Sequence, residues 1–481
     1  MSESVTLTIE GREVEVPAGT SVLEAAKLAG VLIPHYCYHP SLPVAGVCRM
    51  CIVEIEKQPK LAASCATAAT PGMVVHVQSG QAKAARQSVL EFLLINHPLD
   101  CPICDQAGEC ELQDYVFQEG RSGTRYGEYA KRYSPVEEFG PDVLYVPNRC
   151  ILCTRCVRFM DDVAQESVLN VSERGDRAHI GIFEGEALDH AWSGNVVDLC
   201  PVGALLSKDF LHKARAWDLD RTASVCTGCT QGCNTTIETR EGQVVRVRPR
   251  PNMEVNRHFM CDEGRLGYQW MNRGDRLEAP LVRDQHGKLV PADWEKALAK
   301  AAELVCGAKG GAVALVSAGA SCEALERAAG LVKQAGGRGA FRVRIGDERP
   351  LAGVSDLALR AERAPNVHGA LEAGFTRDWD AAIGFARSAP LVVVLDEALE
   401  GVTALPAATI YIGTTLPEVA RQHAAVVLPS ASVAEEDGTF RNLAGRVQAY
   451  YQAKTPPGMA RPAAWILAEI RDLTTAAGAR A

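Results

Sequence analysis

The chain contains 481 residues, of which 50 are Lys or Arg and 59 are Asp or Glu, so its formal net charge at pH 7 is -9. The basic residues are spread along the sequence and form no concentrated patch, which argues against nucleic-acid binding. A chain of this length exceeds the size that one hydrophobic core supports, so we expect about three to five domains.

The chain begins Met-Ser-Glu-Ser-Val, which lacks a basic segment followed by an apolar one, and no uninterrupted apolar stretch approaches a membrane span. We therefore expect a soluble, intracellular protein. In a reducing compartment, spaced cysteines indicate metal binding or catalysis more often than disulfides. Fifteen of the seventeen cysteines lie between Cys37 and Cys261, so we expect the metal chemistry in that part of the chain.

The first 80 residues predict a small domain of the β-grasp type with a metal centre. Residues 5–16 alternate around a Gly-containing turn, which predicts a β-hairpin, and Ser21 with Glu24 predicts a cap for a helix over 22–28. Gly46 offers a loop that can wrap closely around a metal. Four cysteines have a spacing related to that of plant-type ferredoxins. They predict one [2Fe-2S] cluster, bound by Cys37, Cys48, Cys51 and Cys65.

Residues 81–120 predict a helix followed by a second metal centre. Helix formers with an apolar face fill 81–95, and the helix should end as Pro98 approaches. Thiolate ligands select zinc, copper(I) or iron-sulfur clusters, so the residue types leave the metal open. A three-cysteine zinc site with a surface histidine is the simpler alternative. Neighbouring cluster motifs favour a [4Fe-4S] cluster on His97, Cys101, Cys104 and Cys110.

Residues 140–216 resemble a two-cluster ferredoxin domain that has lost one cluster. In bacterial two-cluster ferredoxins a cysteine triplet is followed by a fourth cysteine and proline, and the fourth cysteine serves the other cluster. Here that position is Met160. Where a second triplet would be needed, the chain has His190, Ser193 and Val196. One [4Fe-4S] cluster is therefore predicted, bound by Cys150, Cys153, Cys156 and Cys200, the last directly before Pro201.

Residues 219–275 contain the fourth cysteine set. Two strands over 235–239 and 243–248 are predicted to flank a turn at Glu241 and Gly242. Three closely spaced thiols and one returned by this hairpin can close a tetrahedral cage. Structural zinc also takes four thiolates, so the set alone does not decide between zinc and a [4Fe-4S] cluster. Its members are Cys226, Cys229, Cys233 and Cys261.

The tail, residues 276–481, predicts a parallel α/β layer because strands alternate with helices. Helices are predicted over 294–305, capped by Asp293, and over 321–335; strands are predicted over 312–316, 391–395, 409–412 and 424–428. No Gly-x-Gly-x-x-Gly follows any of these strands, so no dinucleotide-binding fingerprint is recognised. Cys306 and Cys322 are interpreted as ordinary residues and not as ligands.

Sixteen candidate ligands in four sets suit a series of centres that moves single electrons. The neutral imidazole of His97 replaces a negative thiolate, which should raise the reduction potential of its centre. The sequence shows no hydrolytic triad, P-loop or carboxylate dyad. We therefore expect the chain to carry no catalytic residues of its own.

Several motifs resemble one iron-sulfur family of bacterial NADH-quinone oxidoreductase, respiratory complex I, namely its G subunits. The resemblance is specific over residues 1–270. It is carried by Cys37-Tyr-His-Pro, Gly46-Val-Cys-Arg-Met-Cys, Glu91 to Asp105, Arg149 to Phe159, and Gly194 to Leu205. The tail resembles the molybdopterin-oxidoreductase-like domain of that family more loosely, through Ala361 to Asn366 and Glu436 to Gln448.

The resemblance implies an electron relay within a proton-translocating complex at the cytoplasmic side of the bacterial inner membrane. A partner subunit holds flavin and oxidises NADH. Electrons then pass from the Cys37 centre to the Cys150 centre and the His97 centre, and leave through another iron-sulfur subunit toward quinone. The Cys226 cluster lies off this route and occurs only in some members. The tail is shorter than the family usually carries, and without a molybdenum-ligand position we expect no molybdenum, pterin, flavin or NAD on this chain.

Two alternatives remain at this point. The relay chains of NAD-linked formate dehydrogenases and hydrogenases share the early clusters, but they would continue into a full pterin domain or a hydrogen-activating cluster domain. A zinc-bound interaction scaffold would use the same cysteine sets without electron transfer. Iron and zinc content would distinguish the scaffold from both relays.

Overall fold

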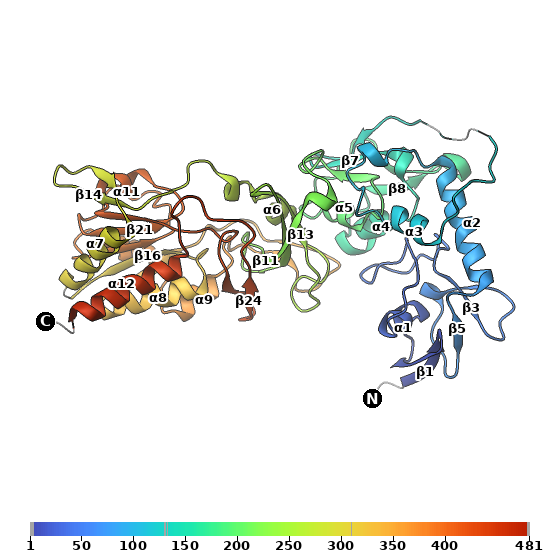
Figure 1. Ribbon diagram of the computed structural model, residues 1–481, viewed down its shortest axis with the longest axis horizontal. Helices are drawn as coiled ribbons and strands as arrows, with labels where there is room; N and C mark the ends of the chain where they lie inside the picture. The colour runs from blue at the N-terminus through green and yellow to red at the C-terminus, as the bar shows by residue number, and fades with distance from the viewer. Residues whose placement is uncertain (1–3, 129–130, 132, 309, 479–481) are drawn as a thin grey trace. The chain divides into compact units, whose positions relative to one another are not determined.

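The computed structural model describes residues 4–128, 131, 133–308 and 310–478. The chain divides into two compact units (Figure 1). The first comprises Met1–Leu219 with Leu351–Ser355, and the second comprises Asp220–Pro350 with Asp356–Ala481. None of the described helices combines the length and the apolar character needed to cross a membrane.

The first unit begins with a five-stranded sheet in the order β2-β1-β5-β3-β4. Its strands are β1 (Ser4–Ile9), β2 (Arg12–Pro17), β3 (Ile52–Ile55), β4 (Ala62–Ala63) and β5 (Val74–His76). Helix α1 (Val22–Leu28) begins after Ser21, whose hydroxyl accepts a hydrogen bond from the N–H of Glu24. The antiparallel β1–β2 hairpin and this helix confirm the two predicted elements.

The core of this sheet holds part of the first cysteine set. Apolar side chains of β1 and α1 pack together, and the thiols of Cys51 and Cys65 are buried among them. The β1 residues that face this core alternate along the strand, as expected for a sheet with one buried face. A rigid strand layer therefore supports two of the four candidate ligands.

Helix α2 (Gly80–Asn96) confirms the predicted helix over 81–95. Ser79 caps its start by accepting a hydrogen bond from the N–H of Ala82. The helix ends before His97, because a following proline disfavours the helical conformation for the residue that precedes it. The next helix is α3 (Glu111–Glu119), after the short 3-10 helix η2 (Cys101–Ile103).

The rest of the first unit is built from short elements around the third cysteine set. A three-stranded sheet has the order β10-β7-β6, and β8 pairs with β9 as a hairpin. Helix α4 (Arg155–Arg158) continues into a π-helical turn, η4 (Phe159–Ala164). The remaining elements are η1 (Ser64–Ala66), β6 (Glu137–Glu138), β7 (Val143–Tyr145), η3 (Pro147–Arg149), β8 (Leu169–Ser172), η5 (Gly175–Arg177), β9 (His179–Ile182), α5 (Asn195–Leu199), β10 (Leu205–Ser207) and η6 (Ala216–Asp218).

The second unit begins with an antiparallel sheet of β11 (Asp220–Val225), β12 (Asn234–Arg240) and β13 (Gln243–Pro249), which confirms the two predicted strands there. A late hairpin of β23 (Gly438–Arg441) and β24 (Val447–Tyr450) shares the apolar core of this sheet. Two short helices follow β13, α6 (Asp262–Leu266) and η7 (Gln269–Asn272).

A seven-stranded sheet in the order β15-β14-β22-β21-β20-β16-β17 forms the rest of the second unit. Five strands run parallel, and the β14–β15 hairpin adds an antiparallel edge that the sequence did not predict. A separate two-stranded pair joins β18 (Arg349–Pro350) to β19 (Ala358–Leu359). The strands are β14 (Leu281–Arg283), β15 (Leu289–Pro291), β16 (Val313–Ser317), β17 (Arg338–Arg342), β20 (Val392–Leu395), β21 (Thr409–Gly413) and β22 (Val426–Pro429).

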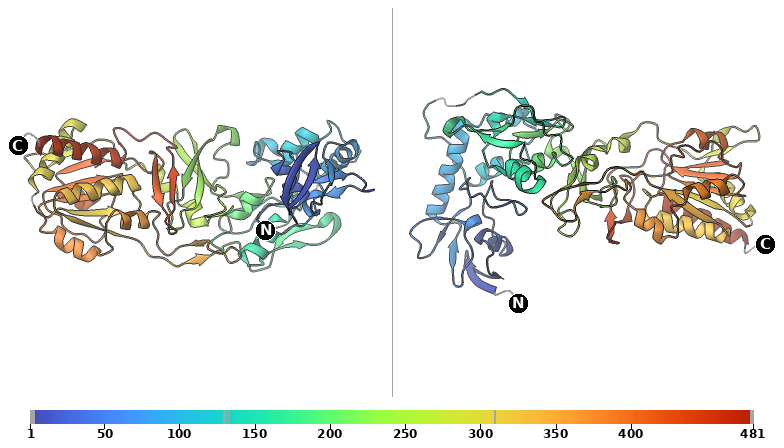
Figure 2. Two further views of the ribbon diagram at one scale, coloured as in Figure 1. Left: turned by 90° about the horizontal axis from the view of Figure 1, so that it is seen from below. Right: turned by 180° about the vertical axis from the view of Figure 1, so that it is seen from behind.

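Helices cover both faces of this sheet, as Figure 2 shows. One face packs against α7 (Trp294–Gly307), α8 (Cys322–Gln334), α9 (Val367–Glu372) and α12 (Ala463–Gly478). The other face packs against α10 (Trp379–Ala386) and α11 (Glu418–His423). The predicted strands and the two helices of the tail are confirmed, with Asp293 and Ser321 as the N-caps of α7 and α8.

A cavity of about 250 Å³ lies where the parallel strands end at their carboxyl edge. This is the position at which open α/β sheets commonly place polar residues and ligands. Its lining includes Ser317 at the end of β16, Asp396 after β20 and Glu436 after β22. Burial raises the pKa of Glu436 to about 8, so this carboxyl group retains a proton at neutral pH.

Candidate metal centres

The Cys37 set lies in loops that flank the first sheet. Cys51 precedes β3 and Cys65 lies in η1. The Sγ atoms of Cys51 and Cys65 are 3.3 Å apart, and the N–H of Cys37 lies 3.4 Å from Sγ of Cys48. Gly46 adopts a φ of 65°, in the left-handed region that glycine favours, so the loop can curl as predicted.

Hydrogen bonds within this set divide its thiols into two kinds. Bonding to neighbouring thiols lowers the pKa of Cys37, and bonding to Cys65 lowers the pKa of Cys51 to about 7. The corresponding bonds, with burial, raise the pKa of Cys48 and Cys65. The structure thus brings all four predicted ligands of this set into one interacting group, in which Cys37 and Cys51 form thiolates more readily than Cys48 and Cys65.

The His97 set is drawn from the end of α2, the turn η2 and the start of α3. Cys101 is exposed, Cys104 is buried, and Cys110 is the N-cap residue of α3. Burial, with smaller contributions from the nearby Cys104 and Cys101, raises the pKa of Cys110 to about 11. The structure therefore places the three thiols close together.

His97 has the protonation state of a metal ligand. Burial, together with the nearby charges of Lys131 and Arg149, lowers its pKa to about 4, so the ring is neutral at pH 7. Its buried Nδ1 atom has no hydrogen-bond partner among the described residues. A buried polar atom without a partner is costly, and coordination to a metal would remove that cost. Burial raises the pKa of Cys104, and the charge of Arg149, which also acts on His97, offsets part of that rise.

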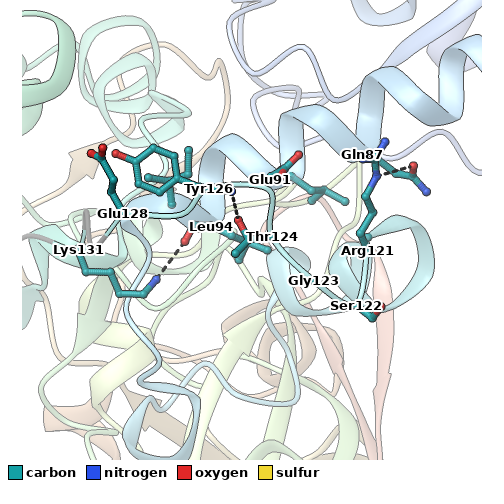
Figure 3. A pocket seen from close by; sticks show the side chains of 13 residues that line it. Gln87, Glu91, Leu94, Arg121, Ser122, Gly123, Thr124, Tyr126, Glu128 and Lys131 are labelled. Atoms are coloured by element: carbon teal, nitrogen blue, oxygen red, sulfur yellow. Dashed lines mark hydrogen bonds between the residues drawn. The ribbon is translucent and has the colours of Figure 1, made fainter.

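A loop that starts at Gly120 packs along α2 near Gln87, Glu91 and Leu94 (Figure 3). Arg121 donates to the side chain of Gln87, and Arg125 forms a paired contact with the carboxylate of Glu91. The ammonium group of Lys131 donates to the carbonyl oxygens of Leu94 and His97, at 3.1 and 2.5 Å. A lysine in this position stabilises the terminal carbonyls of a helix.

The four thiols of the Cys150 set line one cavity, together with apolar side chains that include Ile180 and Val202. The loop turns back twice, because Leu152 and Thr154 adopt φ values of 52° and 59°. The N–H of Leu152 lies 3.4 Å from Sγ of Cys150. Hydrogen bonds of this kind tune cluster potentials, and the enclosed apolar cavity suits a cluster shielded from water.

Burial raises the pKa of Cys150 to about 11 and that of Cys153 to about 12. A buried thiol of this kind becomes a thiolate when a metal supplies the compensating positive charge. The donor set therefore fits a [4Fe-4S] cluster. A second cysteine triplet would occupy the positions of His190, Ser193 and Val196. The first two lie before helix α5, and Val196 lies on it.

The Cys226 set is buried throughout, between the end of β11 and the start of α6. The N–H of Gly228 lies 3.4 Å from Sγ of Cys226. A Cβ atom on Gly264 would lie 2.7 Å from Sγ of Cys226 and 3.6 Å from Sγ of Cys261, so both sulfur atoms converge on this glycine. Burial raises the pKa of Cys226 to about 12 and also raises those of Cys229, Cys233 and Cys261.

Across the described residues, no group of three or more His, Cys, Asp or Glu side chains has the spacing of ligands around a metal ion. The assignment of each set to a cluster therefore depends on the residue types, their burial and the contacts given above. Cys306 is exposed, and Cys322 is half-buried with its Sγ 3.4 Å from Oδ1 of Asn366.

Sequence reasoning missed the basic side chains around these sites. Arg149, Arg155 and Arg158 lie next to cysteines of the third set, and Lys131 lies in the loop beside α2. For the three arginines, their position within the motif Arg149 to Phe159 was the available signal. The sequence does not reveal which distant carbonyl or carboxylate groups these side chains reach.

Five family models match successive parts of the chain. They are a 2Fe-2S iron-sulfur cluster binding domain over 2–80, an NADH-ubiquinone oxidoreductase-G iron-sulfur binding region over 86–125, the ferredoxin-like domain of NADH-quinone oxidoreductase subunit 3 over 140–206, a molybdopterin oxidoreductase Fe4S4 domain over 219–273, and molybdopterin oxidoreductase over 276–366 and 389–473. The chain is therefore an iron-sulfur protein with 2Fe-2S and 4Fe-4S binding domains and a molybdopterin-oxidoreductase-like tail.

Curated relatives give a more specific similarity than the domain models. The chain is similar to the G subunit of NADH-quinone oxidoreductase. It is 45% identical over 301 residues to the G subunit from Rickettsia bellii, which covers 63% of this chain and 44% of the relative. The G subunit from Streptomyces coelicolor is 44% identical over 308 residues, covering 64% and 36% of the two chains. The mitochondrial NADH-ubiquinone oxidoreductase 78 kDa subunit of Neurospora crassa is 47% identical over 299 residues, covering 62% and 40%.

These alignments span less than half the length of the relatives. Among solved structures, an NAD+-reducing [NiFe]-hydrogenase in the H2-reduced state has a chain that is 32% identical with a TM-score of 0.40. That alignment covers 44% of this chain and 91% of the other.

Proposed function

We propose that this chain is an electron-relay subunit of an NADH-quinone oxidoreductase, respiratory complex I. The observation that carries the proposal is the 44–47% identity, over 299–308 residues, to relatives that bear this name. The four cysteine sets support it, because a series of iron-sulfur centres carries single electrons. In this proposal the whole complex couples electron transfer to proton translocation, and this chain contributes no substrate-converting residues.

The four centres occupy the four cysteine-rich segments. A [2Fe-2S] cluster is held within 1–80 by the Cys37 set, and [4Fe-4S] clusters are held within 81–120, 140–216 and 219–275 by the His97, Cys150 and Cys226 sets. Each centre supplies one-electron redox chemistry when it is bound. The protein holds the thiolates, excludes water and sets the charge around each site. The tail, 276–481, takes part without molybdenum, pterin, flavin or NAD of its own.

Electrons travel from a flavin-bearing partner subunit to the Cys37 site, then to the Cys150 site and the His97 site, and leave for a further iron-sulfur subunit. The buried environment of the Cys150 cavity supports its place in such a relay, because a shielded centre reorganises little water on reduction. The chain reaches the membrane only through its partners, on the cytoplasmic side, and binds no nucleic acid.

Metal analysis of the purified chain tests this proposal. Iron and acid-labile sulfide should be present in amounts that match one [2Fe-2S] and three [4Fe-4S] clusters, and the reduced protein should give their signals in low-temperature EPR. Colourless protein with stoichiometric zinc would overturn it. Purification of the native assembly should also recover membrane subunits with quinone-dependent NADH oxidation, whereas hydrogen or formate oxidation would assign the chain to another enzyme.

A further inference from the structure

Two arginines of helix α4 contact the loops of three candidate sites. Arg155 and Arg158 lie on either side of the ligand Cys156, and Arg155 is only 4% exposed. A buried guanidinium group is stable only when its charge and its N–H groups find partners. The partners of both side chains lie far away along the chain, next to ligands of other sets.

Arg158 joins the Cys37 site to the Cys150 site. Its Nη2 atom lies 2.5 Å from the carbonyl oxygen of Cys37 and 3.3 Å from that of Cys153. Its Nη1 atom lies 2.5 Å from the carbonyl oxygen of Pro43, in the same loop as Cys37. One planar group therefore contacts the backbone of a ligand residue in each of two sites.

Arg155 joins the Cys150 site to the other two. Its Nη atoms form a bidentate pair with Glu111, at 3.0 and 3.2 Å, and Glu111 directly follows Cys110. Nη1 also lies 3.2 Å from the carbonyl oxygen of Leu199, the residue before Cys200. Nη2 lies 2.9 Å from the carbonyl oxygen of Tyr38, the residue after Cys37.

We propose that Arg155 and Arg158 are positioning residues that fix the distances between the three sites. The proposal rests on the proposed function, since the distances matter only if the sites hold clusters. Electron transfer slows steeply with distance, so a relay needs its centres held at fixed spacing. Arginine suits this task because its rigid fork of five N–H donors can bind several acceptors in one plane.

The same charge acts on the electronic properties of the central site. The guanidinium group of Arg155 is buried beside this site, because it contacts the carbonyl oxygen of Leu199, which directly precedes the candidate ligand Cys200. A cluster gains negative charge on reduction. Removing the charge of Arg155 should therefore lower the midpoint potential of the Cys150 centre, whereas a change that keeps the charge should not.

The test uses the full chain loaded with iron and sulfide. Arg158→Met and Arg155→Met remove the contacts, and Arg158→Lys and Arg155→Lys keep the charge but lose the fork. Arg12→Met is the matched control, because the guanidinium of Arg12 also donates to two carbonyl oxygens, those of Ala29 and Gly30, within the first sheet domain. Metal content, EPR midpoint potentials and the intercluster distance distribution from pulsed EPR are measured for each protein.

We expect native metal content in the variants, with a shifted or broadened distance distribution between the Cys37 and Cys150 centres in Arg158→Met and Arg158→Lys. Arg155→Met should lower the midpoint potential of the Cys150 centre and alter the intercluster distances. Arg155→Lys should have the native midpoint potential, because it keeps the charge, but the altered intercluster distances. Arg12→Met should match the native protein in both measurements.

Native distance distributions in cluster-loaded variants of both arginines would overturn the positioning role. If the Met variants do not load clusters, the Lys variants decide the same question, because they retain the charge that compensates the thiolates. Failure of the proposed function is a separate result, in which the native chain itself carries no iron-sulfur clusters.

Discussion

Gly203 lies against Cys104 so closely that a Cβ atom at this glycine would overlap with the Sγ atom of Cys104. The two residues belong to different cysteine segments of the first unit, and the contact leaves the thiol no room to move toward Gly203. Gly203→Ala should therefore displace Cys104 and prevent the His97 site from holding its cluster. Iron analysis should show the loss of one cluster, with the EPR signals of the other centres retained.

Gly127→Ala is the control for this change, because a Cβ atom at Gly127 would meet nothing within 4 Å. It should retain the full iron content. Full iron content in Gly203→Ala would contradict the expectation that displacement of Cys104 disrupts the His97 site.

His97→Cys should keep a [4Fe-4S] cluster and lower its reduction potential. The neutral imidazole would be replaced by a negative thiolate, and added negative charge disfavours reduction. A redox titration followed by EPR measures the midpoint of this centre. His286→Cys, at an exposed histidine in the second unit, controls for the introduction of a cysteine. An unchanged midpoint in His97→Cys would contradict the tuning role of the imidazole.

Glu119→Ala should strongly destabilise the first unit. Arg86 has a fully buried side chain, and its Nη2 atom lies 3.1 Å from Oε2 of Glu119. Removing one partner of a buried pair leaves an uncompensated charge, at a cost of about 3–5 kcal/mol in the free energy of unfolding. Urea denaturation, followed by hydrogen exchange in α2 and α3, measures the loss.

The control for this prediction is Glu56→Ala. Glu56 pairs with His76 at 3.0 Å, but their side chains are 49% and 40% exposed. Loss of an exposed pair costs about 1 kcal/mol or less. Equal effects of the two substitutions would show that burial of Arg86 does not determine the cost.

Glu436→Gln should stabilise the second unit more at pH 8 than at pH 5. Burial raises the pKa of Glu436 from its ordinary value of 4.5 to about 8 in the folded chain. Between these values the folded state binds more protons than the unfolded state, so stability falls as pH rises through this window. Glutamine does not titrate and can still accept the hydrogen bond that Tyr450 donates at 3.0 Å.

The gain from Glu436→Gln should reach roughly 2–4 kcal/mol at pH 8. Urea denaturation of both proteins at pH 5 and pH 8 measures it. A gain in the free energy of unfolding that is larger at pH 8 than at pH 5 would support this prediction. A gain of equal size at both pH values would contradict it, because a change in packing alone does not depend on pH.

Local signals in the sequence predicted the elements that carry the sites. The helix over 22–28, the end of α2 shortly before Pro98 and the capping of α7 by Asp293 all follow from interactions between near neighbours. The spacing of the thiols in the Cys150 set also indicated their convergence in one cavity. These features needed no knowledge of distant contacts.

Contacts over long sequence separations were not predictable. Arg155 and Tyr38 are separated by 117 residues, and nothing in either local pattern specifies that they meet. The antiparallel pairing of β14 with β22 depends in the same way on the assembled sheet. The burial of Nδ1 of His97 likewise depends on the assembled chain and not on the local sequence.

The fully buried Arg86 shows that the first iron-sulfur segment does not end structurally at residue 80. Its side chain starts from α2, beyond the first iron-sulfur segment, yet it donates to the carbonyl oxygens of Ile52 and Val77 within that segment. A shortened piece that ends at residue 80 would lose both bonds together with the cation that supplies them. The interior of the first ferredoxin segment thus includes a side chain from the segment that follows it. The first segment could not be exchanged for another ferredoxin unless α2 were exchanged with it.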